Sequence, residues 1–174
     1  PAAAGFRFCQ EEEILRKVRF SPQRPVVLVV GGVKEDKIEA AKEMASWVDK
    51  ILVGGKLVEV IFKNKDKVWV GKLREDGQDL DGVTIKQFEE EIKKAGTVIF
   101  AGPVSNTTKG FFEGTRALFE AALSGEAFVL AGGGDTEAAL TKLGLTDRID
   151  YISAGGGAML AYLAKGTLPG IEAL

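Results

Sequence analysis

The stretch that decides the fold is "VLAGGGDTEAALTKLG", residues 129–144. It has an apolar run typical of a buried strand, then three glycines, then a helix that begins near Asp135 and Thr136. A short connection alone rarely needs three glycines, whereas a backbone that a ligand approaches closely needs residues without side chains. We expect that ligand to be a phosphate, because the free N–H groups at a helix start bind anions.

Outward from this stretch, apolar runs rich in β-branched residues alternate with amphipathic segments. Strands buried on both faces read as continuous apolar runs, and helices read as apolar residues every three or four positions. Alternation of this kind predicts right-handed βαβ units, hence a three-layer, Rossmann-like α/β fold with a parallel sheet and helices on both faces. The predicted strands are 24–32, 51–55, 97–103, 127–134 and 149–157, and the predicted helices are 35–50, 84–96, 109–123, 135–145 and 158–166.

Every predicted strand ends in small residues. The carboxyl ends of parallel strands lie along one edge of a sheet, so these turns are expected to line a single crevice, where ligands of this architecture bind. Each glycine by itself could serve only a tight turn, but five such ends favour a binding crevice. None has the spacing of a Walker A loop or a dinucleotide fingerprint. The residues are Gly31, Gly32, Gly54, Gly55, Gly102, Pro103, Gly132, Gly133, Gly134, Gly155, Gly156 and Gly157.

Composition excludes several classes of protein. The chain has 174 residues, enough for one good core, and a formal net charge of −2 without a basic block, so we expect no nucleic-acid partner. No apolar run is long enough to span a membrane. It has no histidine, which removes Ser-His-Asp catalysis, and its single cysteine, Cys9, indicates a reducing compartment. We therefore expect a cytoplasmic protein. The opening "PAAAGF" is not a signal peptide and does not begin with methionine, so we expect a piece of a longer chain.

Several stretches resemble the carboxyl-terminal, nucleotide-binding half of phosphoglycerate kinase. They are "RPVVLVVGGVKEDKI", "VDKILVGG", "GPVSNTTKGFFEGTRAL", "VLAGGGDTEAALTKLGL" and "YISAGGGAMLAYLAKGTLPGIEAL". The opening "AAAGFRFCQEEEI" resembles the helix that links the two halves of that enzyme. The resemblance implies a linking helix over residues 1–20 and a nucleotide-binding domain over residues 21–174.

The family transfers a phosphoryl group between 1,3-bisphosphoglycerate and ADP in glycolysis, with Mg²⁺; it is a phosphotransferase with a carboxyl acceptor. By resemblance, Lys34, Gly133 and Gly156 have catalytic roles, and Asp135 is linked to the metal. Lys34, Lys37, Thr136 and the glycine turns, with Pro103, would bind the phosphates of ADP or ATP. Either lysine could instead be solvated at a helix start, and Asp135 could instead be a helix N-cap.

The sequence also departs from the family. The stretch "KEDK" is one residue short, which leaves the register of Lys34 relative to Lys37 open. Lys56 stands where the family has a third glycine, and Ala101 where it has asparagine. Thr108 stands in the place of the glutamate near the nucleotide ribose. These changes leave nucleotide affinity and base preference open.

Residues 56–82 are too few for the helix-and-strand insertion of the family. "KLVEVIFKNKDKVWVGKL" (56–73) is rich in β-formers around a polar turn, so we expect a β-hairpin with arms at 57–62 and 67–73. Four lysines, Lys63, Lys65, Lys67 and Lys72, would lie near its tip, mostly solvated.

Two functions remain open from the sequence. In the family, the triose substrate and an essential arginine lie on the amino-terminal half, so these 174 residues alone are expected to bind nucleotide and transfer nothing. The chain would then be one half of a kinase whose partner is the missing triose-phosphate-binding half. The alternative is a non-catalytic descendant that serves as a nucleotide-binding or structural module.

Overall fold

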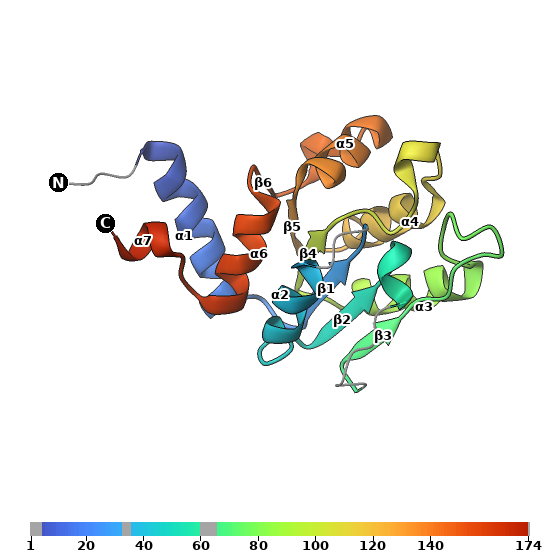
Figure 1. Cartoon of the computed structure of the whole chain (residues 1–174), viewed down its shortest axis with the longest axis horizontal. Helices are drawn as coiled ribbons and strands as arrows, with labels where there is room; N and C mark the ends of the chain where they lie inside the picture. Colours follow the sequence, from blue (N-terminus) through green and yellow to red (C-terminus); the bar gives the residue numbers. More distant parts are fainter. Residues whose placement is uncertain (1–4, 33–35, 60–65, 174) are drawn as a thin grey trace.

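A computed structural model describes residues 5–32, 36–59 and 66–173. Six parallel strands form one sheet in the order β3-β2-β1-β4-β5-β6. Helices cover both of its faces, which confirms the predicted three-layer α/β fold (Figure 1). The strands are β1 Val26–Val30, β2 Lys50–Val53, β3 Val68–Val70, β4 Thr97–Ala101, β5 Phe128–Gly132 and β6 Tyr151–Ser153.

The strand order reverses between β1 and β4. From β1 the chain builds outward to β2 and β3, and from β4 it builds the other way to β5 and β6. The segments that leave β1 and β4 therefore diverge at the carboxyl edge of the sheet, where open parallel sheets bind their ligands. The register aligns Val30 of β1 with Ala101 of β4, so Gly31 and Gly102 follow side by side.

Alternate residues of each strand feed two separate cores. Val26, Leu28 and Val30 of β1 face a core shared with α1 (Phe6–Phe20), α2 (Asp36–Met44) and α6 (Gly156–Lys165). Val27 and Val29 face the other core, with α3 (Gly82–Ile92), α4 (Glu113–Ala122) and α5 (Gly134–Leu143). Burial on both faces explains why the strands are continuous apolar runs. Shorter elements are the 3₁₀ helices η1 (Gly55–Glu59), η2 (Thr107–Lys109) and η3 (Thr146–Arg148), and α7 (Pro169–Glu172).

The predicted β-hairpin is wrong. Residues 57–59 belong to the 3₁₀ helix η1, and the strand expected in the second arm, β3, pairs in parallel with β2. The edge of β2 offers backbone groups that need partners: the Ile51 N–H donates to the Lys67 carbonyl at 2.8 Å, and the Gly71 N–H donates to the Val53 carbonyl at 2.9 Å. Extending the main sheet satisfies these groups, which a separate hairpin does not. Residues 60–65, with Lys63 and Lys65, lie outside the described residues.

Lys67 has a structural role that differs from the expected solvated position. Its Nζ donates hydrogen bonds to the carbonyl oxygens of Ala45 at 3.2 Å and Val48 at 3.1 Å, in the turn that follows α2. A cation is favourable there, because carbonyls at the end of a helix lack backbone partners. Lys72 is exposed, as expected.

Helix α1 lies within the segment predicted as a linking helix, residues 1–20. Its Leu15 and Val18 are buried in the same core as α2 and α6. The helix itself lies alongside α6 (Figure 1). No helix in the described ranges is long and apolar enough to cross a lipid bilayer.

Candidate functional site

Two cavities flank the point where the strand order reverses. The first, of about 470 Å³, lies between α2 and α6 and reaches the starts of α5 and α6; we call it the helix-start cavity. The second, of about 400 Å³, lies among η1, the loop after β4 and residues 77–78; we call it the loop cavity. Both volumes are ordinary for small-molecule sites. Asp135 lines both cavities, so a ligand in one is adjacent to the other.

Most of the predicted site residues reach one of these cavities. Gly31, Gly54, Gly102 and Gly155 line neither. The helix-start cavity is lined by Lys37, Gly132, Gly133, Gly134, Asp135, Thr136, Gly156 and Gly157, and the loop cavity by Gly32, Gly55, Pro103 and Asp135. Lys34 lies outside the described residues.

Helices α5 and α6, each of ten residues, both begin at the helix-start cavity. Their N-cap residues are Gly133 and Gly155, which have no side chain to accept a hydrogen bond from the first N–H groups. Two helix starts whose N–H groups have no side-chain cap, and two positive dipole ends, therefore meet at one cavity. That arrangement favours an anion with several acceptor oxygens.

Many of the glycines serve the packing of the chain against itself. A Cβ on Gly31 would lie 2.3 Å from the Pro103 carbonyl oxygen, and one on Gly156 would lie 2.5 Å from the Gly133 nitrogen. Both distances are far below any real contact, so only glycine fits there. At these two positions the fold itself requires glycine, which is the alternative that the sequence left open for any single glycine.

Gly134 and Gly157 are different. A Cβ on either would meet nothing within 4 Å, and both residues line the helix-start cavity. Neither adopts a positive φ, so the backbone does not require glycine there. At these two predicted glycines, neither crowding nor backbone conformation explains the missing side chain.

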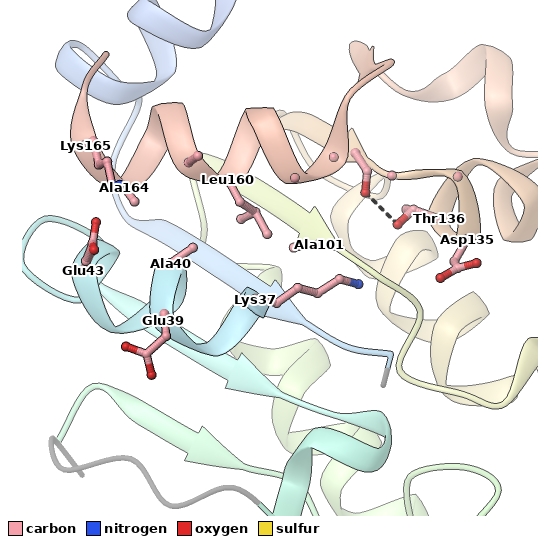
Figure 2. A pocket seen from close by; sticks show the side chains of 16 residues that line it. Lys37, Glu39, Ala40, Glu43, Ala101, Asp135, Thr136, Leu160, Ala164 and Lys165 are labelled. Atoms are coloured by element: carbon pink, nitrogen blue, oxygen red, sulfur yellow. Dashed lines mark hydrogen bonds between the residues drawn. The ribbon is translucent and has the colours of Figure 1, made fainter. Parts of the chain in front are cut away.

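Lys37 extends from the first turn of α2 toward the side of the helix-start cavity where Asp135 and Thr136 lie (Figure 2). Its Nζ donates a hydrogen bond to the Gly31 carbonyl at 3.0 Å and is part-buried. An ideal Cβ on Gly102 would lie 2.4 Å from this nitrogen, so glycine after β4 makes room for it. The lysine is therefore directed into the crevice and is not a solvated residue at a helix start.

Asp135 and Thr136 differ in burial and in role at the start of α5. Thr136 is buried, and its hydroxyl donates to the Gly132 carbonyl at 2.9 Å, which fixes the β5–α5 turn (Figure 2). Asp135 is exposed and lies within the first turn, after the N-cap Gly133, so it is not the helix cap. The described residues contain no group of three or more His, Cys, Asp or Glu side chains that could hold a metal. A cation at Asp135 would need further oxygen ligands from a bound molecule.

A buried polar cluster that the sequence did not predict holds one wall of the loop cavity. Asp79 is 1% exposed, and its carboxylate accepts from the Ser105 hydroxyl at 2.7 Å and the Gly114 N–H at 3.2 Å. The Thr115 hydroxyl accepts from the Val104 and Ser105 N–H groups, both at 3.1 Å. In the sequence, "DGQDLDG" resembles an exposed turn, and only the adjacent apolar Leu80 hints at burial.

Helix α6 is anchored away from the cavity by Tyr162. Its hydroxyl donates to the Glu12 carboxylate of α1 at 2.9 Å. Burial, with this hydrogen bond, raises the pKa of Tyr162 from 10.0 to about 12. The contact ties α1 to the helix whose start forms the cavity.

The chain is similar in sequence to members of a known protein family. The phosphoglycerate kinase family model matches residues 1–78 and 70–166, in two pieces that meet where β3 leads into α3. A phosphoglycerate kinase of Dictyoglomus turgidum is 32% identical over 228 aligned positions, covering 100% of this chain and 58% of that protein. One of Oenococcus oeni is 34% identical, covering 99% of this chain and 55% of its own length.

Solved structures agree with the sequence relatives. The structure of phosphoglycerate kinase from Coxiella burnetii superposes with a TM-score of 0.83 at 28% identity, covering 97% of this chain and 57% of that one. The chain thus spans a little more than half the length of the relatives it matches. Its alignment with the Dictyoglomus protein is longer than the chain itself, so the relative carries internal residues that this chain lacks. With the family model matched along most of its length, the chain belongs to the phosphoglycerate kinase family.

Proposed function

We propose that this chain is the nucleotide-binding half of a phosphoglycerate kinase and that one Mg²⁺-nucleotide spans both cavities. The observation that carries the proposal is Asp135, which lines both cavities and lies beside two helix starts without side-chain caps. A nucleotide has the matching shape: an anionic chain of phosphates joined to a neutral nucleoside. The phosphates lie at the starts of α5 and α6, and the nucleoside lies in the loop cavity.

The residues around the phosphate position can stabilise transferring charge. N–H groups of α5 and α6 supply donors fixed in place by the fold, and Lys37 supplies a cation. Phosphoryl transfer depends mainly on such positioning and charge neutralisation. Lys34, which lies outside the described residues, is proposed to contact the transferring phosphoryl group.

Asp135 fits a magnesium ion carried in by the nucleotide. Mg²⁺ at nucleotide sites is held by one or two carboxylates, with phosphate oxygens and waters as the other ligands. One exposed carboxylate that lines both cavities meets that requirement. When bound, the ion would neutralise charge on the phosphates; Asp135 would orient it.

The direct test is titration calorimetry with Mg-ADP up to millimolar concentration. We expect saturable heat, and we expect the Lys37→Met variant to bind Mg-ADP more weakly while its affinity for adenosine is unchanged, because only phosphates interact with the charge. A charge-assisted contact contributes about 1.5–3 kcal/mol, so the affinity for Mg-ADP falls roughly ten- to a hundredfold. Absence of heat with wild-type protein would refute the site, and equal weakening for adenosine would assign Lys37 to folding alone.

We expect the 174 residues alone to show no phosphoglycerate-dependent ATP turnover. The chain spans only 58% of the Dictyoglomus relative, and the triose site is proposed to belong to the rest of such a protein. A coupled assay tests this, and measurable turnover by these residues alone would contradict the proposed division of roles. Adding the amino-terminal half of a relative in trans should restore activity to a kinase half, whereas a non-catalytic module, suggested by Lys56 and Thr108 in the loop cavity, would stay inactive.

A further inference from the structure

The lining of the loop cavity differs from that of most small-molecule pockets, which are lined mainly by apolar and aromatic side chains. Among the described residues that line it there is no aromatic ring and no Val, Leu, Ile or Met side chain, and the ring of Pro103 is the one apolar side chain. A nucleotide base therefore finds no ring on which to stack. Charged and polar side chains make up most of the remaining lining.

Two lysines of the loop cavity come from segments on the two sides of β1. Lys56 lies in η1, which follows β2, and Lys109 is the last residue of η2, which follows β4. In the sheet, β2 and β4 are the two neighbours of β1 (Figure 1). Gly32, which lies just beyond the end of β1, also lines the cavity. The two cations therefore flank a stretch of bare backbone.

The chain itself does not neutralise these two charges. Both lysines are exposed, and within the part of the chain that the structure describes neither makes an ion pair. Lys50 and Lys94, in contrast, both pair with Glu91. Asp135 is the one acidic residue among the described lining residues, so the lining has more positive than negative charge. Such a lining favours an anion.

From this lining we infer that the two cavities also bind linear inorganic polyphosphate. Its first phosphates lie at the starts of α5 and α6, and the following phosphates lie between Lys56 and Lys109. This ligand goes beyond the proposed nucleotide function but uses the same anion position at the helix starts. A polyphosphate is charged along its whole length and so matches both cavities, whereas a nucleotide offers its charge only to the first.

Asp135 lines both cavities and is the one lining carboxylate that would repel such a chain at the point where it passes from one cavity to the other. Polyphosphate in solution carries Mg²⁺, which accepts carboxylate and phosphate oxygens as ligands together. The Mg²⁺ form of the chain therefore turns this repulsion into an attraction. All the tests below use Mg²⁺ salts for this reason.

The first test varies the length of the chain in titration calorimetry. Pyrophosphate is long enough for the helix-start cavity alone, whereas tetrapolyphosphate extends to the two lysines. Solvent weakens exposed ion pairs, so each lysine is expected to strengthen binding roughly threefold and both together roughly tenfold. We expect tetrapolyphosphate to bind about tenfold more tightly than pyrophosphate, with tripolyphosphate between them. Equal affinity for all three would overturn the inference.

The second test separates a site from general attraction of a polyanion. Lys56→Gln combined with Lys109→Gln should remove the advantage of tetrapolyphosphate and leave the affinity for pyrophosphate unchanged. The matched control is Lys86→Gln combined with Lys93→Gln, which removes the same charge from two exposed lysines of the α3 segment that line neither cavity. The control should keep the advantage. Equal loss in both pairs, or loss of pyrophosphate affinity in the first pair, would contradict the inference.

Mg-ADP is titrated separately, which keeps this inference distinct from the proposed function. Binding of Mg-ADP without an advantage for tetrapolyphosphate would refute the inference and leave the proposed function standing. An advantage for tetrapolyphosphate without binding of Mg-ADP would do the reverse. Where both bind, tetrapolyphosphate is expected to displace Mg-ADP, because the two ligands share the helix-start cavity. Simultaneous binding of both would refute the shared position.

Discussion

The helix-start cavity and the loop cavity share Asp135 but are built in different ways. The first is formed by regular elements: two helix starts that follow two neighbouring strands, β5 and β6. The second is formed by segments far apart in the chain, residues 77–79 and 103–115, joined by side-chain hydrogen bonds. The first cavity is therefore a consequence of topology, whereas the second depends on a few individual side chains.

The largest effect is expected from removing the carboxylate that joins the two segments of the loop cavity. Asp79→Ala leaves the buried donors of Ser105 and Gly114 without an acceptor, so the free energy of unfolding should fall by about 3 kcal/mol. Urea denaturation measures the change, with Asp147→Ala, an exposed aspartate in η3, as the matched control.

The same variant distinguishes the two cavities by ligand. Binding of Mg-ADP should weaken more than binding of Mg-pyrophosphate, because pyrophosphate does not need the loop wall. Equal loss for both ligands would mean that the two cavities are not independent in structure.

The helix-start cavity can be tested with a pair of adjacent glycines. Gly156→Ala places a Cβ 2.5 Å from the Gly133 nitrogen, and we expect it to lower the free energy of unfolding by about 2 kcal/mol, as overpacking does. Gly157→Ala fills open space and should leave stability unchanged or raise it by about 0.4–1 kcal/mol, since alanine restricts the unfolded chain.

Ligand binding should separate the same pair. If a bound phosphate approaches the backbone of Gly157, a methyl group at this position would obstruct it. The stable Gly157→Ala variant should then bind Mg-pyrophosphate more weakly than wild type in calorimetry. Unchanged affinity in this variant would remove the ligand-based reason for that glycine.

A smaller effect concerns the anchor of α6. Tyr162→Phe removes the hydrogen bond to Glu12 and should lower the free energy of unfolding by about 1–2 kcal/mol at pH 7. The pKa of Tyr162 is higher in the folded chain, about 12 against 10.0, so this contribution is complete below pH 10. It is lost as the pH rises from about 10 to about 12, where the folded protein retains a proton that the unfolded chain releases.

The expected result is therefore a difference between wild type and Tyr162→Phe that is constant from pH 7 to about 9.5 and shrinks toward pH 12. Chemical denaturation at matched pH values measures it. A difference that persists undiminished at pH 12 would show that the hydroxyl does not make the bond to Glu12.

The contrast between the cavities also explains what the sequence could predict. Continuous apolar runs and glycine turns were enough for the parallel sheet, both helix starts and the place of Asp135, because these depend on periodicity over many residues. These patterns did not predict the parallel pairing of β3 with the edge of β2. Local composition favoured a hairpin there, and only the free edge of β2 explains the observed pairing. Asp79 was missed because its burial depends on Ser105 and Gly114, which lie far away in the chain.

The roles of individual glycines could not be predicted from the sequence either. The sequence gives Gly156 and Gly157 the same environment, yet one packs against Gly133 and the other faces open space. The surroundings of each glycine in the folded chain distinguish a glycine that the fold requires from one that is open to a ligand.

The measurement that most directly tests one nucleotide spanning both cavities is chemical-shift mapping of ¹⁵N-labelled chain with Mg-ADP and, separately, Mg-pyrophosphate. We predict that Mg-ADP perturbs the backbone amides of Gly134, Asp135 and Gly157 together with those of Lys56 and Thr108, and that Mg-pyrophosphate perturbs only the first group. Absence of perturbation, or perturbation of one cavity only by Mg-ADP, would contradict the proposal.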